Sequence, residues 1–242
     1  WSAGAPVGRA GGLCWRGGDA PHPAGTEDAG VGMTSARTRE RLRRRLLEAG
    51  IRNPEVLDLL SRLPRHRFVD EALASHAYED AALPIGHGQT LSQPYAVARM
   101  TEALLEPRLP QSVLEIGTGS GFQTAVLASL ARRVYSMERI AALLETARRR
   151  LAEMRLRNVR LRHADGALGW PEYAPFDAIL VTAAPPGIPR TLVHQLRIGG
   201  CMVLPMGQGA EQVLVRVIRT PDGYSPEILE PVNFVPLLSG LA

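Results

Sequence analysis

Residues 113–122, VLEIGTGSGF, decide the fold of this chain. A short apolar run that carries one carboxylate is followed by three alternate glycines, and QTAVLA at 123–128 is typical of the start of a helix. Glycine lets the backbone pass close to a ligand because no side chain intervenes. A strand, a glycine turn and a helix N-terminus form the nucleotide-binding corner of a Rossmann-like sheet. The stretch therefore predicts a cofactor site at the end of this strand.

The spacing of the glycines distinguishes between two classes of cofactor. A dinucleotide fingerprint is G-x-G-x-x-G, but Phe122 stands where its third glycine belongs. G-x-G-x-G fits S-adenosyl-L-methionine better, because this cofactor has no pyrophosphate to place on the helix N-terminus. We therefore expect Gly117, Gly119 and Gly121 to form the cofactor loop. A tight strand-to-helix turn without a ligand is the alternative interpretation.

The composition is that of one globular domain, with 45% hydrophobic residues among 242. All 28 basic residues are arginine, which excludes Schiff-base and lysine-base chemistry because arginine stays protonated. Alanine, glycine, proline and arginine are abundant, so a bias toward GC-rich codons explains the pI of about 9.6 at least as well as a nucleic-acid partner does. Six arginines between residues 37 and 45 either contact phosphates or form the solvated face of a helix, and the second interpretation is favoured.

The sequence predicts neither a metal site nor a membrane span. Cys14 and Cys201 lie far apart, outside any metal-ligand spacing, and the six histidines form no metal-ligand pattern. No stretch approaches the roughly 18 consecutive apolar residues of a membrane helix. We expect a cytoplasmic protein that binds neither a metal nor a membrane.

The chain divides by composition into an extension and one domain. Residues 1–32 are rich in Gly, Ala and Pro without periodicity, so we expect a disordered extension before Met33. Residues 33–242 are expected to form one domain, which binds the cofactor. Within it, residues 33–95 supply N-terminal helices and a substrate or lid segment, and residues 96–242 supply the cofactor-binding core and a C-terminal hairpin.

Hydrophobic periodicity predicts helices that alternate with strands. Helices are expected over 34–50, 54–63, 94–105, 122–131, 141–154 and 190–196. Strands are expected over 112–116, 134–137, 159–163, 176–183 and 201–204, with a closing hairpin from 212–219 and 228–238. This alternation predicts an α/β fold: a Rossmann-like, doubly wound, mostly parallel sheet with an antiparallel C-terminal hairpin and an N-terminal helical segment.

Three carboxylates fall at the carboxyl ends of the predicted strands, where such sheets bind their ligands. Glu138 follows Gly117 by 21 residues, which matches the roughly 20-residue spacing of a ribose-binding acid. Asp165 can accept a hydrogen bond from an adenine amino group. Glu115 can favour the positively charged methionine end, directly or through water. Each acid taken singly is also explained by a helix cap or a surface charge.

Three further stretches carry a resemblance to one family. They are YEDAALPIGHGQTLSQPY at 78–95, PRHRFV at 64–69 and FVPL at 234–237. With the glycine loop they resemble the protein-L-isoaspartate O-methyltransferases over about residues 34–240. The part at 83–94 is more particular than the loop, because other methyltransferases have no reason to share it. This chain departs from the family pattern at Asn233, directly before FVPL, where arginine or a residue other than asparagine is expected.

This resemblance implies a repair enzyme. Its family transfers the methyl group of S-adenosylmethionine to the α-carboxylate of L-isoaspartyl residues in aged proteins, and the ester then closes to a succinimide. The family's active-site serine falls on Ser92. Its cofactor contacts fall on Gln89, Thr118, Glu138, Arg139, Asp165 and Gly166. Substrate contacts are expected at Ile85, His87 and Val235, and the partners are isoaspartyl peptides and proteins.

The substrate carboxylate, with a pKa of about 3.5–4, is ionised at neutral pH, so catalysis is expected to be mainly positioning. Ser92 would orient one carboxylate oxygen; helix capping by its side chain is the structural alternative. His87 is the alternative catalyst, although the chemistry needs no base.

Rival functions are another class I methyltransferase acting on a small molecule or RNA, an NAD-dependent dehydrogenase, and a cofactor-binding regulator without turnover. We expect a monomer without a specific nucleic-acid partner.

Overall fold

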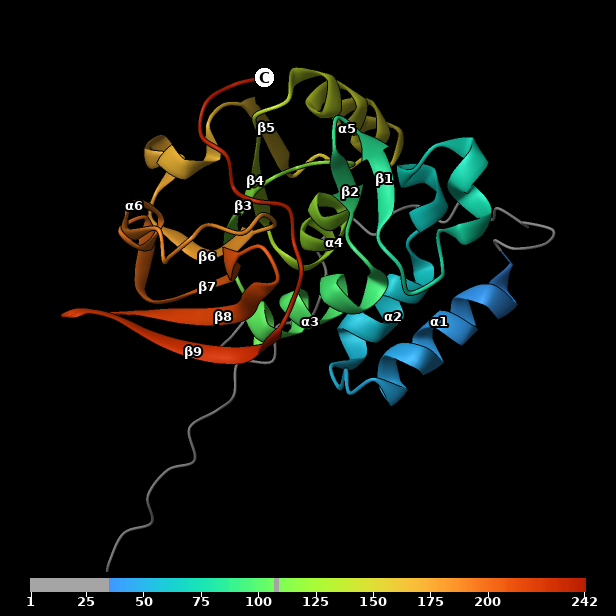
Figure 1. Cartoon of the computed structure of the whole chain (residues 1–242), viewed down its shortest axis with the longest axis horizontal. Coiled ribbons are helices and arrows are strands. Elements are labelled where there is room, and N and C mark those ends of the chain that lie inside the picture. Colours follow the sequence, from blue (N-terminus) through green and yellow to red (C-terminus); the bar gives the residue numbers. More distant parts are fainter. Residues whose placement is uncertain (1–34, 107–108) are drawn as a thin grey trace, which may run out of the picture.

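The computed structural model describes residues 35–106 and 109–242, so the extension expected over residues 1–32 lies outside the described residues. Seven strands form one sheet in the order β5-β4-β3-β6-β7-β8-β9 (Figure 1). The first five of these run parallel, and β8 and β9 add antiparallel pairs at one edge. The predicted α/β architecture is therefore confirmed.

The strands of the large sheet are β3 (Ser112–Ile116), β4 (Arg133–Glu138), β5 (Val159–His163), β6 (Phe176–Val181), β7 (Leu196–Gln208), β8 (Glu211–Thr220) and β9 (Gly223–Pro231). All six residues of β6 are buried, as expected for a parallel strand covered on both faces. β5 lies at an edge and exposes Arg160 and Arg162, which protects that edge from pairing with another chain.

The helices are α1 (Ala36–Glu48), α2 (Pro54–Arg62), α3 (Pro94–Leu105), α4 (Phe122–Leu130), α5 (Ala141–Glu153) and α6 (Arg190–Val193). Four short 3-10 helices are η1 (Arg65–Phe68), η2 (Glu71–His76), η3 (Gly166–Leu168) and η4 (Pro171–Tyr173). α2 begins as its sequence predicts, with Pro54 in the first turn and the Asn53 side chain accepting from the Glu55 and Val56 amides.

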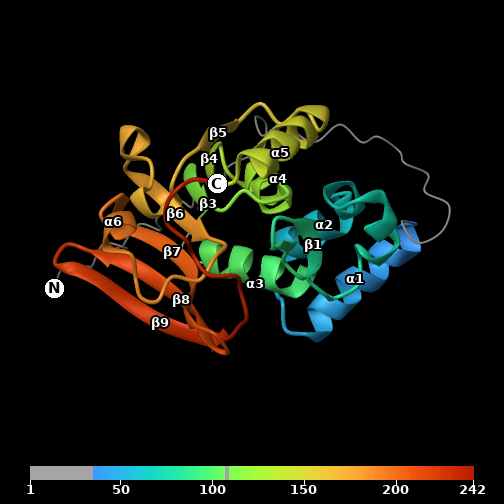
Figure 2. The same ribbon diagram turned by 45° about the horizontal axis from the view of Figure 1, so that its top comes forward.

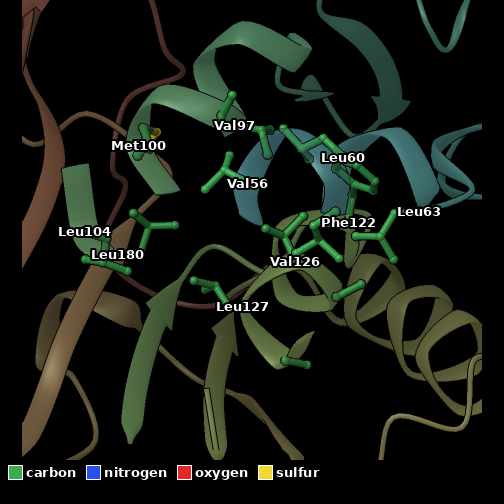
Figure 3. Close-up of a cluster of buried hydrophobic side chains, with 14 of the residues drawn as sticks. Val56, Leu60, Leu63, Val97, Met100, Leu104, Phe122, Val126, Leu127 and Leu180 are labelled. Carbon is green, nitrogen blue, oxygen red and sulfur yellow. The ribbon is translucent and has the colours of Figure 1, made fainter. Parts of the chain in front are cut away.

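Two apolar clusters cover the two faces of the sheet. Neighbouring residues of β3 contribute to different clusters, Val113 to one and Leu114 to the other, because side chains alternate along a strand. Helices α1–α4 pack in the first cluster, and α6 packs in the second. Figure 3 shows how α2, α3 and α4 meet, with Leu60, Met100 and Val126 among the buried side chains. The helical segment before residue 95 thus shares its core with the sheet.

The expected strand over 228–238 is wrong in its position. β9 starts at Gly223 and ends at Pro231, because a tight turn at Pro221 and Asp222 returns the chain directly from β8. Residues 232–242, here called the C-terminal segment, leave the sheet and form only an isolated bridge between Pro236 and Ala184. Proline lacks an amide hydrogen, so Pro231 and Pro236 do not favour continued pairing.

Two other elements differ in length from their predictions. β7 spans Leu196–Gln208 rather than only 201–204, since it pairs with β6 on one side and with the long β8 on the other. α6 is correspondingly short and ends at Val193 instead of 196, because Leu196 already belongs to β7.

A small hairpin precedes α3, in the segment for which the sequence predicted only a lid. Strands β1 (Leu83–Gly86) and β2 (Gln89–Leu91) pair antiparallel. The two turn residues His87 and Gly88 have φ of 54° and 68°. Positive φ at both central positions is the requirement of a type I′ turn, which suits the twist of a hairpin. Residues 83–93, which include this hairpin and Ser92, are called the serine flap below.

Candidate active site

One pocket lies at the carboxyl ends of β3, β4 and β6, where the fold predicts a ligand site. Its walls come from four parts of the chain that are distant in sequence. They are the glycine loop after β3, the end of β4 with the residues after it, the serine flap, and the C-terminal segment. Met100 of α3 and Thr182 after β6 also line it.

The glycine loop is fixed by its two neighbouring strands. The amides of Gly117 and Thr118 both donate to the Met137 carbonyl of β4, at 2.8 and 3.1 Å. On the other side, Thr182 Oγ1 lies 2.8 Å from the Gly117 carbonyl, to which it donates. Gly117 has φ of +95°, and a Cβ on it would lie 2.3 Å from that hydroxyl oxygen. Only glycine fits this position without moving Thr182.

Gly121 serves packing rather than the pocket. It is the N-cap of α4 with φ of +90°, and it is not among the residues that line the pocket. A Cβ on Gly121 would lie 3.2 Å from the Ala147 side chain of α5. The third glycine of the loop therefore allows α4 and α5 to approach each other.

Glu138 ends β4 and lines the pocket with its carboxylate anchored at the rim. Its Oε2 accepts from the Gly119 amide at 2.8 Å, and its Oε1 accepts from the Ile140 amide at 3.0 Å. Hydrogen bonds from backbone amides stabilise the ionised form of a carboxylate. This acid is held beside the loop in an orientation suited to further hydrogen bonds with ligand hydroxyls.

Glu115 lies beneath the loop and does not line the pocket. Its side chain is fully buried, and burial raises its pKa to about 8 despite hydrogen bonds from two hydroxyls. Thr124 Oγ1 and Ser136 Oγ both donate to Oε2 at 2.5 Å, whereas Oε1 has no partner among the described residues. Ser136 Oγ in turn lies 2.7 Å from Thr118 Oγ1, so this buried network reaches the loop.

Asp165 follows β5 and binds two backbone amides instead of lining the pocket. Its Oδ1 accepts from the Ala167 amide at 2.9 Å, and its Oδ2 accepts from the Gly240 amide at 2.7 Å. Gly166 does line the pocket, and a Cβ there would lie 2.3 Å from Ile116 Cγ2. Arg139 also lines it while donating from Nε to the Gly240 carbonyl at 3.0 Å.

The C-terminal segment crosses the ends of the strands and closes one side of the pocket. The Ala184 amide donates to the Val235 carbonyl, and the Leu237 amide donates to the Ala184 carbonyl, both at 2.8 Å. Farther along, the Ala242 amide donates to the Arg139 carbonyl at 2.8 Å. Figure 2 shows this red segment running from β9 across the sheet toward β4 and β5. Residues 235–238 line the pocket on the way.

The serine flap lies against the glycine loop. A Cβ on Gly119 would lie 3.4 Å from Ile85 Cδ1, so the hairpin and the loop are in contact distance. Ser92 lines the pocket, and within residues 35–106 and 109–242 its hydroxyl makes no hydrogen bond. The alternative interpretation, that the Ser92 side chain caps α3, is wrong: the N-cap is Gln93, and this cap has no side-chain hydrogen bond.

The pocket brings together most of the residues that the sequence proposed. Those lining it are Ile85, Gln89, Ser92, Gly117, Thr118, Gly119, Glu138, Arg139, Gly166 and Val235. Those outside its lining are His87, Glu115, Gly121 and Asp165. His87 is exposed at the tip of the hairpin, where its carbonyl accepts from Gln89 Nε2 at 3.4 Å. The roles of all these residues stay predictions.

Sequence reasoning missed two residues that position the site. Thr182 follows β6 and fixes the glycine loop; its signal is a polar residue directly after the apolar run of β6. Arg65 donates from Nη2 to the Ser92 carbonyl at 2.7 Å, and it lies in the PRHRF stretch whose family resemblance assigned it no role.

Among the described residues, no group of three or more His, Cys, Asp or Glu side chains is arranged to hold a metal ion. No helix in the same part of the chain has the length and apolar character needed to cross a membrane.

Comparison with known proteins gives a family match over most of the chain. The profile of the protein-L-isoaspartate(D-aspartate) O-methyltransferase family matches residues 37–242. A Marinobacter nauticus protein named protein-L-isoaspartate O-methyltransferase 1 is 58% identical over 212 residues, covering 88% of this chain and 96% of the relative.

Two solved structures are similar over the same region. A protein-L-isoaspartate O-methyltransferase superposes with a TM-score of 0.75 and 26% identity, covering 84% of this chain and 67% of that chain. A Plasmodium falciparum structure, described as a beta-aspartate methyltransferase in complex with S-adenosyl-L-homocysteine, has a TM-score of 0.72 at 24% identity. The latter match covers 83% of this chain and 98% of that chain and supports the fold alone.

Proposed function

This chain belongs to the protein-L-isoaspartate(D-aspartate) O-methyltransferase family, and we propose that Ser92 holds the substrate carboxylate against a cofactor bound at the glycine loop. It is an S-adenosylmethionine-dependent enzyme that methylates the α-carboxylate of L-isoaspartyl residues in damaged proteins. The observation that carries the proposed arrangement is the shared pocket: Ser92 and Gly117 line it from segments that are distant in sequence.

The residues of the pocket fit S-adenosylmethionine. Gly117 and Gly119 line the pocket without side chains, as expected where backbone must approach a ligand closely. Glu138 presents an anchored carboxylate for the ribose hydroxyls, at the end of the strand next to the loop. We propose that Thr118, Gly119, Arg139 and Gly166 contact the cofactor, with Gln89 contacting it from the serine flap.

Glu115 and Asp165 are proposed to act from behind the pocket wall. Glu115 reaches Thr118 only through Ser136, so its influence on the methionine end passes through the loop. Asp165 binds the Gly240 amide and thereby fixes the C-terminal segment, next to Gly166 in the wall. If the adenine amino group donates directly to Asp165, the carboxylate oxygen that accepts has to be shared with the Ala167 or the Gly240 amide.

S-adenosylmethionine supplies the methyl group as a sulfonium electrophile. The substrate carboxylate is already ionised at neutral pH, so no side chain has to remove a proton. Ser92 Oγ donates a hydrogen bond to one carboxylate oxygen and leaves the other directed toward the methyl group. Fixing reacting atoms in line supplies up to about 7–11 kcal/mol in the best intramolecular cases. Among the described residues the Ser92 hydroxyl has no hydrogen-bond partner that would compete with this bond.

The substrate peptide is proposed to lie along the C-terminal segment. A second hollow, lined by residues 207–210, Asn233 and Phe234, shares Pro236 and Leu237 with the cofactor pocket. An extended peptide in this hollow would reach Val235 and bring the free α-carboxylate of its isoaspartyl residue toward Ser92. Ile85 and His87 would contact the same peptide from the serine flap.

The test of the function is methyl incorporation from labelled S-adenosylmethionine into an isoaspartyl peptide. The matched aspartyl peptide and tRNA serve as controls. Incorporation into the isoaspartyl peptide alone is expected. Incorporation into tRNA instead would favour the alternative, an RNA methyltransferase, and binding without any turnover would favour a cofactor-binding regulator.

Ser92→Ala tests the proposed catalytic role, with Ser129→Ala as its control. Ser129 lies on α4, outside the pocket lining, and its hydroxyl donates to the Ala125 carbonyl. We expect Ser92→Ala to lower kcat at least about a hundredfold, because misplacement of reacting atoms by about 1 Å has this effect. Affinity for S-adenosylhomocysteine should stay within about twofold. Equal kcat values for the two variants would contradict the role of Ser92.

We propose that the protein acts as a monomer in the cytoplasm, without metal or nucleic acid. A protein substrate needs an open groove, and the second hollow provides one at the surface. Arg37, Arg41 and Arg44 are exposed on α1, as expected for a solvated helix face. Light scattering of the purified protein tests the oligomeric state, and a dimer mass would contradict it.

A further inference from the structure

Arg65 is a buried arginine that the proposed chemistry does not use. It begins η1, and only 1% of its surface is exposed. Burial lowers its pKa to about 9, so the guanidinium remains charged at neutral pH. Burying a charged group costs free energy unless its donors are paired. The hydrogen-bond partners of the Arg65 donors therefore decide how much of this cost is offset.

The guanidinium of Arg65 joins three segments of the chain. Its Nε donates to the Ala77 carbonyl after η2, and its Nη2 donates to the Ser92 carbonyl, both at 2.7 Å. Its Cζ lies 5.0 Å from the centroid of the Phe122 ring. Phe122 is the first residue of α4 and directly follows Gly121 of the glycine loop. One planar group thus contacts both the serine flap and the helix that begins at the cofactor loop.

Ser92 depends on its backbone for a fixed position. Its hydroxyl makes no hydrogen bond within the described ranges, and Pro94, two residues later, has no amide hydrogen to contribute. The bond from Arg65 therefore fixes the peptide group of Ser92 from outside the hairpin. Rotation or displacement of this peptide group would move the Ser92 side chain relative to the glycine loop.

The burial of Arg65 is not optimised for stability. Its Nη1 is buried without a hydrogen-bond partner in the part of the chain that the structure describes. An unpaired buried donor costs about 1–3 kcal/mol. Well-packed apolar side chains often replace a buried charged group without loss of stability. A side chain retained at this cost is expected to fix the relative positions of the segments that it contacts.

We infer that Arg65 is a positioning residue for methyl transfer, which holds the Ser92 peptide group at a fixed distance from the glycine loop. This inference rests on the catalytic role proposed for Ser92. The Ser92 hydroxyl has to reach the carboxylate while the carboxylate faces the cofactor, and a displacement of about 1 Å costs about a hundredfold in rate. Lysine is a poor replacement, since it has a single ammonium instead of a planar fork that binds two carbonyls and stacks on a ring.

The test is a double-mutant cycle of Arg65→Lys and Ser92→Ala, with kcat expressed per molecule that binds S-adenosylhomocysteine. We expect Arg65→Lys to lower kcat by about ten- to a hundredfold and to leave that affinity within about twofold. In the Ser92→Ala background the same change should lower kcat by no more than about twofold, since residues that act together are not additive. If the two losses multiply, or if Arg65→Lys leaves kcat unchanged, the inference is overturned.

Arg45→Gln is the matched control. Arg45 on α1 also donates to a backbone carbonyl, that of Tyr78, next to the Ala77 carbonyl that Arg65 binds. Its loss removes a similar bond without touching Ser92, so kcat should stay within about twofold. If Arg65→Lys does not fold, Arg65→Gln is measured in the same cycle. A parental kcat in Ser92→Ala would defeat the proposed role of Ser92 itself, whereas loss of activity only in Ser92→Ala would defeat the inference on Arg65 alone.

Discussion

The glycine loop and the serine flap face each other across one pocket but are built in different ways. The loop is part of a continuous strand, turn and helix, and its amides bind the neighbouring strand at Met137. The flap is a short hairpin followed by two residues, Ser92 and Gln93, without regular structure, and side chains such as Arg65 and Ile85 connect it to the rest. The geometry of the loop therefore depends on local backbone contacts, whereas the position of the flap, where we propose that the substrate is held, depends on side chains from distant parts of the sequence.

The largest expected effect comes from adding one methyl group to the loop. Gly117→Ala would displace the Thr182 hydroxyl from two carbonyls and strain a residue with φ of +95°. We expect S-adenosylhomocysteine affinity to fall at least about a hundredfold, equivalent to about 3 kcal/mol.

Gly88→Ala, on the flap, is the control for backbone strain. Its φ is +68°, but a Cβ there has nothing within 4 Å. It should cost only about 1–2 kcal/mol of stability and leave cofactor affinity unchanged, as calorimetry can show. If Gly117→Ala and Gly88→Ala bind S-adenosylhomocysteine with similar affinity, cofactor binding does not depend more on the backbone of the glycine loop than on that of the flap.

The second prediction concerns the buried carboxyl group beneath the loop. The pKa of Glu115 is raised from 4.5 to about 8 by burial. Below the lower value both states hold the proton. Between the two values the unfolded chain releases it and the folded protein keeps it, so the free energy of unfolding decreases as pH rises and becomes level above about pH 8. Glu115→Gln should remove this dependence, which we expect to be on the order of 5 kcal/mol.

Urea unfolding of the cofactor-free protein at several pH values between about pH 5 and pH 8 measures this dependence. The quantity to compare is the difference between the parent and Glu115→Gln, because other groups titrate equally in both proteins. A difference that does not change with pH would show that Glu115 is already ionised in the folded protein.

A smaller effect is expected at the rim of the pocket. Glu138→Gln keeps an oxygen that can accept from the Gly119 amide but loses the charge that strengthens this bond and those to ligand hydroxyls. Loss of charge from a hydrogen bond is worth about 1.5 kcal/mol, so S-adenosylhomocysteine affinity should fall about tenfold. Glu145→Gln on the exposed face of α5, which breaks only the pair with Arg148, should have no effect. An unchanged affinity of Glu138→Gln would exclude Glu138 as the ribose ligand.

The smallest effect is expected at the tip of the flap. His87 has φ of 54°, and asparagine tolerates this conformation, so His87→Asn keeps the turn. If His87 only contacts the peptide, KM for the isoaspartyl peptide should rise by about two- to fivefold at constant kcat, the effect of one weak hydrogen bond. Steady-state kinetics with His76→Asn as the control measures this. A large fall in kcat would instead identify His87 as a catalytic group.

The difference between local backbone contacts and contacts from distant parts of the chain also explains which features the sequence predicts correctly. The bounds of β3 and β5 match their predictions, and β4 and β6 differ by one or two residues at their ends. β3 and β6 are recognisable as apolar runs, which is typical of buried parallel strands. β5 lies at the edge and is recognisable by the alternation of Val159 and Leu161 with arginines. The loop between β3 and α4 is predictable for the same reason, since one continuous stretch of sequence contains the strand, the glycines and the start of the helix. Glu138 is recognisable because its spacing from the loop is set by the length of one helix and one strand.

The remaining features depend on contacts that no local pattern contains. The apolar residues at 232–238 favour a strand by composition, but they cross the ends of the strands and line the pocket. The turn at Pro221 and Asp222 is the signal that places β9 earlier. The N-cap at Gln93 and the bond from Arg65 to Ser92 depend on how distant segments of the chain pack together, which a single sequence does not reveal.

The pocket is completed by residues that are synthesised late. Val235 and Leu238 line it, and the amides of Gly240 and Ala242 bind to the ends of β5 and β4. During translation, β3–β6 and the serine flap emerge from the ribosome well before this stretch. A nascent chain can therefore assemble the glycine loop early, but it acquires a closed cofactor site only after residue 242 has left the exit tunnel.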